Sequence, residues 1–525
     1  MTTVGEALVR ALKDRGVKVV FGIPGVHTVE LYRGLAGSGI RHVTPRHEQG
    51  AGFMADGYAR VSGRPGVAFV ITGPGLTNML TPMAQARADS VPMLVVSGVN
   101  RRDTLGRGMG HLHELPDQRG MTALVALGSE RIEGPEGLAS ALGRAFAGLA
   151  SGRPGPRHIE VPTDVMPMQA DDIPAPAAPA APALPLDALR RAAQVLGTAQ
   201  RPLILAGGGA RFAGEALRAV AERLGAPVVQ TANARGLMHG HALTVPASPS
   251  LEPVRDLMRG ADMVLAVGTE FGPTEYDMYV VGGVPRPAFL IRIEVDAAQM
   301  ARHPAEIALE GHAEAILPGL AAMLQDRQRS DGLARAARAR EAARAALEPA
   351  MRRQLAVLEA IRDAVPGAIL VGDSTQPVYA GNLYYDHDRP GGWFNAATGY
   401  GALGYGLPAA IGAAIAAPEA PVICLAGDGG AQFTLPELMT AVQERVPLTF
   451  VIWNNRAYRE IAEAMVAAGA EPIGTDPVPP DFALIARACG VPHVCVAADP
   501  AAVAAALGAN PPKDGPVMIE IDVRD

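Results

Sequence analysis

The chain has very little cysteine, since its 525 residues include only Cys424, Cys489 and Cys495. Their spacing fits neither a zinc site nor a disulfide framework, and Cys424 lies in an apolar run expected to form a strand. So few, scattered thiols exclude a disulfide-stabilised scaffold and suit a reducing compartment. We therefore expect a cytoplasmic protein.

Excess positive charge and long apolar runs are also lacking. The chain has 46 Lys and Arg against 53 Asp and Glu, which gives a net charge of −7 at pH 7. This balance, with no basic run, argues against a nucleic-acid surface. No segment reaches the roughly 18–20 apolar residues that a membrane span needs. Residues 1–17 predict a charged amphipathic helix rather than a secretory signal. We expect neither nucleic acid nor membrane as a partner.

The length and the alternation of elements predict several domains. Apolar strands alternate with helical patterns, which favours the α/β class with doubly wound parallel sheets. Proline and alanine dominate residues 173–185, which indicates a linker. We predict a first domain over 1–168, a linker over 169–186, a middle Rossmann-like domain over 187–326, a helical linker over 327–356 and a third domain over 357–525.

Two distant stretches share one plan. Residues 58–75 (YARVSGRPGVAFVITGPG) and 410–429 (AIGAAIAAPEAPVICLAGDG) each contain a small-residue helix, a Pro-containing turn, an apolar strand and a Gly-rich strand end. The first and third domains are therefore predicted to be the same fold twice.

The chain is organised around residues 422–461. An apolar strand breaks at the turn Gly427–Gly430, and after a helical pattern a second apolar strand ends just before Asn455. A Gly-rich turn entering a helix offers backbone N–H groups to phosphate. Asp428 and Asn455, at neighbouring strand ends, offer a carboxylate and an amide oxygen to Mg²⁺. The simpler alternative is a Rossmann-like turn with Asp428 as helix N-cap.

Gly427-Asp428-Gly429, a spacer and Asn454-Asn455 together resemble the diphosphate–metal motif of thiamine diphosphate enzymes. Their domain order, pyrimidine-binding, middle and diphosphate-binding, matches the three predicted domains, so the resemblance covers nearly the whole chain. It implies thiamine diphosphate and Mg²⁺ as cofactors, with Asp428, the Asn455 side chain and the Ala457 carbonyl on the metal. The residues that it implies for cofactor binding are Gly73, Asn78, Gly401, Leu403, Gly427, Asp428, Gly429, Gly430, Ala431, Asn455 and Tyr458.

Leu403 lies in GALGYGLP (residues 401–408), which matches the family segment that places a Leu or Met between the two rings of the bent cofactor. The Gly401 carbonyl would receive the cofactor's 4′-amino group. A Gly-rich helix start with Leu403 in the core predicts the same burial, so this alternative stays open.

Glu48 resembles the family glutamate that hydrogen-bonds the aminopyrimidine ring and drives removal of the C2 proton. Alone, a helix-N-terminal glutamate explains it equally well, but the accompanying motifs favour the activator. His113 lies where relatives have a Gln or His facing the substrate, and His27 lies near the expected pocket. Both are predicted to be catalytic, with surface-loop histidines as the alternative. Thr72 lines the turn facing the thiazolium and is predicted to contact the substrate.

Glu460 and Ile461 follow the metal motif and are also predicted to contact the substrate. A carboxylate there favours a cationic tail such as guanidinium, through a charge-assisted bidentate pair; a solvated helix charge is the alternative. Residues 20–60 look most like decarboxylases of 5-guanidino-2-oxopentanoate.

The resemblance implies a lyase that decarboxylates a 2-oxo acid without oxidation, here 5-guanidino-2-oxopentanoate to 4-guanidinobutanal and CO₂. Because Glu48 and Asp428 lie in different domains, it also implies active sites between chains of a homodimer or homotetramer. Acetolactate synthase-type carboligation is one alternative, although His113 replaces the usual Gln. A non-catalytic nucleotide-binding or regulatory protein that uses Gly207–Ala210 is the other.

Overall fold

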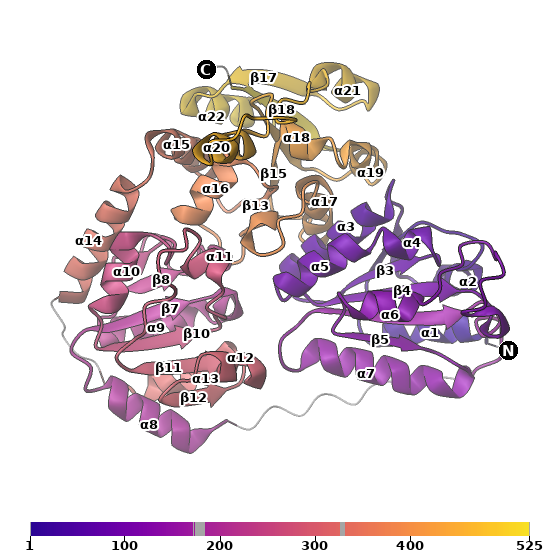
Figure 1. Cartoon of the computed structure of the whole chain (residues 1–525), viewed down its shortest axis with the longest axis horizontal. Helices are drawn as coiled ribbons and strands as arrows, with labels where there is room; N and C mark the ends of the chain where they lie inside the picture. The colour runs from indigo at the N-terminus through magenta and orange to yellow at the C-terminus, as the bar shows by residue number, and fades with distance from the viewer. Residues whose placement is uncertain (1, 172, 174–183, 326–330, 524–525) are drawn as a thin grey trace.

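The computed structural model describes residues 2–171, 173, 184–325 and 331–523. The chain forms three α/β units, and each is built on a six-stranded sheet whose strands pair in parallel (Figure 1). The predicted fold class, three doubly wound domains, is confirmed. Most of the predicted linker over 169–186 lies outside the described residues. No described helix combines the length and hydropathy that a membrane crossing requires.

The first unit has the strand order β2-β1-β3-β4-β6-β5. Strands β1, β3 and β4 are buried and mostly apolar, β6 is mostly buried but carries polar side chains, and β2 and β5 at the two edges of the sheet are partly exposed. The strands are β1 (Val19–Gly22), β2 (Arg41–Val43), β3 (Gly66–Val70), β4 (Met93–Val99), β5 (Gly128–Arg131) and β6 (Pro156–Pro162). The helices are α1 (Val4–Asp14), α2 (Val29–Leu35), α3 (Glu48–Ser62), α4 (Pro74–Thr77), α5 (Leu80–Ala88), α6 (Gln118–Ala123) and α7 (Leu138–Ala150).

The third unit repeats this topology, because its order β14-β13-β15-β16-β18-β17 has the same pattern. The predicted duplication is therefore confirmed, with β3 and β15 in equivalent places. The strands are β13 (Ile369–Gly372), β14 (Trp393–Asn395), β15 (Val422–Gly427), β16 (Thr449–Asn454), β17 (His493–Ala497) and β18 (Val517–Asp522). The helices are α15 (Pro349–Ala364), α16 (Gln376–Leu383), α17 (Gly406–Ala416), α18 (Asp428–Ala431), α19 (Leu438–Gln443), α20 (Arg459–Ala467), α21 (Phe482–Ala488) and α22 (Pro500–Ala509). Helix α14 (Asp331–Ala345) precedes α15 in the chain but packs against the middle unit (Figure 1).

The middle unit has the order β12-β11-β10-β7-β8-β9, which is the Rossmann arrangement. Its strands are β7 (Pro202–Ala206), β8 (Val228–Gln230), β9 (Thr244–Val245), β10 (Met263–Val267), β11 (Leu290–Glu294) and β12 (Ile307–Glu310). Its helices are α8 (Leu186–Leu196), α9 (Gly214–Leu224), α10 (Glu252–Arg259), α11 (Pro273–Tyr276), α12 (Ala297–Arg302) and α13 (Ala313–Met323).

Helix α3 of the first unit packs along α17 of the third (Figure 1). Glycine allows this approach: a Cβ at Gly57 would lie 2.0 Å from the Ala409 carbonyl oxygen, and one at Gly412 would lie 1.9 Å from the Met54 oxygen. The apolar residues around the two helices form one core that continues into both sheets. The helix pair therefore fixes how the two equivalent sheets face each other.

A buried polar network lies beside this helix pair. Arg60 Nε contacts Asp56 at 2.6 Å, and its Nη2 contacts Asp89 at 2.7 Å. The Tyr405 hydroxyl, from the third unit, donates to Asp56 at 2.5 Å. Each buried charge thus has an opposite charge or a hydroxyl beside it, as burial requires.

We expect Gly57→Ala to lower the melting temperature, because its methyl group must push α3 away from the α17 backbone. Overpacking of this kind costs about 1–3 kcal/mol of unfolding free energy. Scanning calorimetry measures the shift. Gly143→Ala is the control, because Gly143 is exposed in α7 with open space around it and alanine favours helix. Equal melting temperatures for the two variants would contradict the close approach.

Candidate functional site

A large cavity, of about 330 Å³, opens at the carboxyl ends of β13, β15 and β16. The strand order reverses between β13 and β15, and such switch points are where open α/β sheets bind ligands. The predicted residues that line it are Gly401, Leu403, Gly427, Asp428, Gly429, Gly430, Asn455, Ala457, Tyr458, Glu460 and Ile461. The lining residues that the sequence did not indicate are Ser374, Thr375, Gln376, Tyr379, Ala397 and Arg459. Ala431 is fully buried in α18 and is not among the lining residues.

Asp428 is the first residue of α18, and Gly427 occupies the N-cap position, so the N-cap alternative for Asp428 is wrong. Its carboxylate is buried. Oδ1 accepts the Asn455 backbone N–H at 3.3 Å, whereas Oδ2 has no hydrogen-bond partner among the described residues. Burial raises the pKa of this carboxyl. A buried carboxylate oxygen without a partner is costly unless a cation meets it.

The neighbouring groups suit a hard cation. Asn455 places its amide oxygen on the Ala457 N–H at 3.1 Å, which leaves a second lone pair on that oxygen. The described residues contain no group of three or more His, Cys, Asp or Glu side chains that could hold an ion. An ion here therefore completes its shell with carbonyl, water or phosphate oxygens, as Mg²⁺ does. The residues present fit the predicted metal–diphosphate pair.

Asp373, at the end of β13, was not indicated by the sequence motifs. Its buried carboxylate accepts the N–H groups of Ser374, Gly404 and Gly406 at 2.8, 3.3 and 2.9 Å. Burial raises its pKa to about 6. Gly404 has φ +80° and no room for a Cβ beside Phe433. Asp373 therefore holds the turn from which Leu403 lines the cavity.

Glu48 begins α3 and is half-buried, with His47 as N-cap. The Asn78 side-chain N–H donates to its carboxylate at 2.9 Å, so two predicted residues meet. The residues that line the large cavity in the described chain all belong to the third unit. Glu48 and Asn78, like the other predicted residues of the first unit, lie outside it.

His27 and His113 lie together in the first unit, with ring centroids 5.2 Å apart. Neither Nδ1 has a hydrogen-bond partner among the described residues, although both atoms are buried. Burial, and then the nearby His113, lowers the pKa of His27, which favours the neutral imidazole. His113 has φ +62°, which strains a side chain of this kind. Placing His113 beside His27 therefore costs backbone conformational energy.

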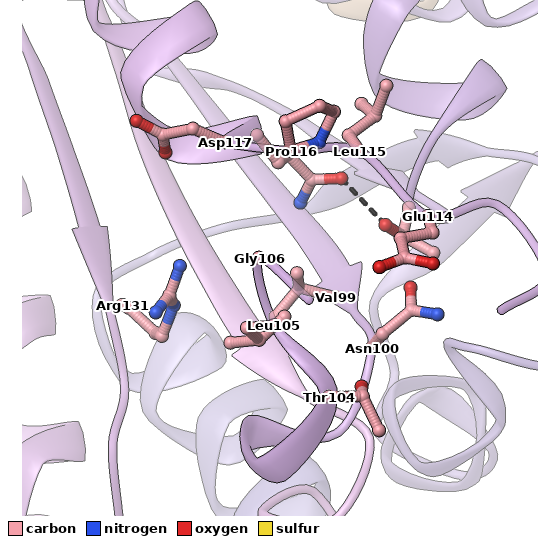
Figure 2. Close-up of a pocket in the computed structure, with 12 residues that line it drawn as sticks. Val99, Asn100, Thr104, Leu105, Gly106, Glu114, Leu115, Pro116, Asp117 and Arg131 are labelled. Carbon is pink, nitrogen blue, oxygen red and sulfur yellow. Dashed lines mark hydrogen bonds between the residues drawn. The ribbon is translucent and has the colours of Figure 1, made fainter. Parts of the chain in front are cut away.

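Glu114 anchors the loop that carries His113. Its carboxylate accepts the N–H groups of residues 108–111 at 2.7 to 3.3 Å. These hydrogen bonds, that of His111 first, lower the pKa of Glu114. Glu114, Leu115, Pro116 and Asp117 also line a small cavity of about 20 Å³ (Figure 2).

Gln118 connects the other side of that cavity to a buried polar network. Its Oε1 accepts the Thr72 hydroxyl at 2.7 Å and the Gly73 N–H at 3.1 Å. Its Nε2 lies 3.2 Å from Ser97 Oγ and 3.0 Å from Glu160 Oε2. Gln118, which the sequence motifs did not indicate, thus holds the Gly73 turn in place through these hydrogen bonds.

Glu460, in the first turn of α20, is half-buried and lines the large cavity, as Gln376 and Tyr379 do. Burial, and then Glu463, raises its pKa, whereas a hydrogen bond with the Gln376 side chain opposes the shift. Ile461 is 55% exposed. The Glu460 carboxylate is therefore an acceptor available to a ligand in this cavity.

Comparison with known proteins finds three matching families. Residues 2–121 match the thiamine pyrophosphate enzyme N-terminal TPP binding domain, residues 189–320 its central domain and residues 373–521 its C-terminal TPP binding domain. The chain is 47% identical over 497 residues to a probable 2-ketoarginine decarboxylase, AruI, of Pseudomonas aeruginosa, which covers 93% of this chain and 88% of that protein. It is 32% identical over 517 residues to the acetolactate synthase isozyme 3 large subunit of Escherichia coli, covering 93% and 89%.

We expect the buried histidine His158, which shares Ser97 with the Gln118 network, to make the stability of the protein depend on pH. His158 lies between the Ser97 and Ser129 hydroxyls at 2.8 Å each, and burial lowers its pKa to about 3. The unfolded chain, with a histidine pKa near about 6.5, binds this proton first, so stability falls as the pH drops below that value. In scanning calorimetry, His158→Gln should show a shallower loss of melting temperature from about pH 7 to about pH 4.5. Exposed His111→Gln is the control; a parallel loss in His158→Gln and the unsubstituted chain would contradict the neutral histidine.

Proposed function

Because this chain belongs to the thiamine pyrophosphate enzyme family, we propose that it is a thiamine diphosphate- and Mg²⁺-dependent 2-oxo acid decarboxylase of the cytoplasm. The observation that carries the proposal is the 330 Å³ cavity at the switch point of the third sheet, with the unpartnered Asp428 oxygen on its wall. The anionic carboxylate and the Gly-rich helix start there suit a cation and a diphosphate respectively.

In this proposal, Asp428, the Asn455 side chain and the Ala457 carbonyl would hold Mg²⁺, and the N–H groups of residues 429–431 would bind the diphosphate. Thiamine diphosphate, when bound, supplies the carbon nucleophile and the electron sink for loss of CO₂. Leu403, on the turn that Asp373 holds, would pack against the bound cofactor. The protein's task is to orient groups and exclude water from the cavity.

Proton movement falls to the first unit. Glu48, oriented by the Asn78 amide, would hold the proton to be exchanged with the aminopyrimidine ring when the cofactor is bound. His27 is favoured in its neutral form, so it can accept a proton or a hydrogen bond near neutral pH. His113 lies beside it and presents the second imidazole to the substrate. The hydrogen bonds from Thr72 and Gly73 to Gln118 keep these two residues in place next to His113.

The proposed assembly is a homodimer or a homotetramer with the active site between chains. Its support is that the large cavity is lined by third-unit residues, whereas Glu48 and the histidines belong to the first unit. In a symmetric dimer, Glu48 of one chain would serve the cavity of the other.

The proposed substrate is 5-guanidino-2-oxopentanoate, which yields 4-guanidinobutanal and CO₂. One support is the similarity to a protein named as a 2-ketoarginine decarboxylase. The other is Glu460, whose half-buried carboxylate lies in the cavity with Gln376 and Tyr379. A guanidinium group matches a carboxylate with two parallel hydrogen bonds and remains charged, so it suits this position better than an apolar tail does.

The test is CO₂ release by the cofactor-loaded protein from 5-guanidino-2-oxopentanoate, pyruvate and 2-oxohexanoate. We expect the guanidino acid to have the highest kcat/KM. Glu460→Gln should lower kcat/KM for that acid about 10-fold or more, as a lost charged hydrogen bond does, and leave 2-oxohexanoate within about 3-fold.

Glu471→Gln, at an exposed position beyond α20, is the matched control and should leave both acids unchanged. Glu48→Gln should abolish CO₂ release from every acid. Equal kcat/KM values for the guanidino and apolar acids would contradict the substrate. Acetolactate as the main product from pyruvate would contradict the decarboxylase.

A further inference from the structure

Gln376, the first residue of α16, connects the proposed metal loop to a buried tryptophan. Its Oε1 accepts the Trp453 indole N–H at 3.4 Å and the Asn455 side-chain N–H at 3.0 Å. Trp453 is the penultimate residue of β16 and is 4% exposed. Gln376 also lines the large cavity, so it touches both the core and the site.

The three side chains fix one another's orientation. An amide can present either its oxygen or its NH₂ group in nearly the same shape, whereas an indole N–H can only donate. Trp453 therefore requires the oxygen of Gln376 to face it. The same oxygen then requires Asn455 to present its NH₂ group, which leaves the Asn455 oxygen on the opposite side.

The Asn455 oxygen is held on that side by a second donor, the Ala457 N–H at 3.1 Å. This orientation matters because only the amide oxygen binds a cation, whereas the NH₂ group repels it. Without Gln376, rotation of the Asn455 amide would be opposed by the Ala457 contact alone.

We propose that Gln376 is a positioning residue for the divalent cation. Because the Trp453 indole can only donate, it fixes the orientation of the Gln376 amide. The Gln376 oxygen then fixes the orientation of Asn455, so that the Asn455 oxygen is presented to the metal. This inference rests on the proposed function. Gln376 lines the same cavity as Glu460. The proposed positioning residue therefore lies in one cavity with the carboxylate proposed to bind the substrate tail.

The test is calorimetric titration of the full chain with Mg²⁺ at saturating thiamine diphosphate, and of thiamine diphosphate at saturating Mg²⁺. Gln376→Met keeps the side-chain length and removes both polar atoms. We expect its Mg²⁺ affinity to fall about 10- to 100-fold, the usual effect of losing a residue that orients a metal ligand. Thiamine diphosphate affinity at saturating Mg²⁺ should change much less, a split that a general loss of structure does not produce.

Trp453→Phe removes only the indole donor, and we expect a smaller loss of Mg²⁺ affinity in the same direction. Trp393→Phe is the matched control, because that buried indole donates to Asn382 Oδ1 at 3.3 Å in the same way but away from the metal loop. The double variant Gln376→Met/Trp453→Phe should bind Mg²⁺ no more weakly than Gln376→Met, because both changes break one chain of contacts.

Unchanged Mg²⁺ affinity in folded Gln376→Met would overturn the inference and leave the proposed function intact. Should that variant fail to fold, equal Mg²⁺ affinities for Trp453→Phe and Trp393→Phe would overturn it. Absence of thiamine diphosphate binding by the unsubstituted chain would instead contradict the proposed function, and this inference with it.

Discussion

A buried carboxylate needs hydrogen-bond donors or a cation beside it, and this requirement determines how the site at the third sheet is built. Asp373 and Asp428 follow β13 and β15, adjacent strands with in-register pairing. Asp373 receives three backbone N–H groups, whereas one oxygen of Asp428 has no partner among the described residues. Asp373 thus stabilises a turn of the protein itself, whereas Asp428 keeps an oxygen that a ligand could meet.

The duplicated topology explains why candidate functional residues lie at two separate places. The first and third sheets share one strand order, so both have a switch point with polar strand ends. In the third sheet this crevice offers a carboxylate, amide and backbone groups suited to a cation and a diphosphate. The first unit carries Glu48 and the two histidines, which are proposed to move protons. The Gly57 and Gly412 contacts between α3 and α17 hold the two sheets at one fixed relation.

The sequence predicted the α/β class, the three sheets and the duplication, because strand periodicity and Gly-rich strand ends are local signals. It also predicted most of the cavity lining, since the predicted lining residues lie in three short segments, 401–403, 427–430 and 455–461, that carry recognisable motifs. It did not indicate Asp373, Gln118 or Gln376, because each acts through partners distant in sequence. Gln376 meets Asn455 across 79 positions, and no spacing rule encodes that contact. An aspartate directly after the predicted strand Ile369–Val371 and Gly372 was the one available signal for Asp373.

The central claim is that the Asp428 carboxylate binds a divalent cation that in turn holds thiamine diphosphate. Calorimetric titration of the purified chain with thiamine diphosphate, with Mg²⁺ and then with a chelator, tests it most directly when Asp428→Asn is measured alongside. The account predicts binding that requires the cation and is lost in Asp428→Asn, because a neutral amide cannot replace the charged ligand. Equal binding in the presence of chelator, or undiminished binding by Asp428→Asn, would contradict it.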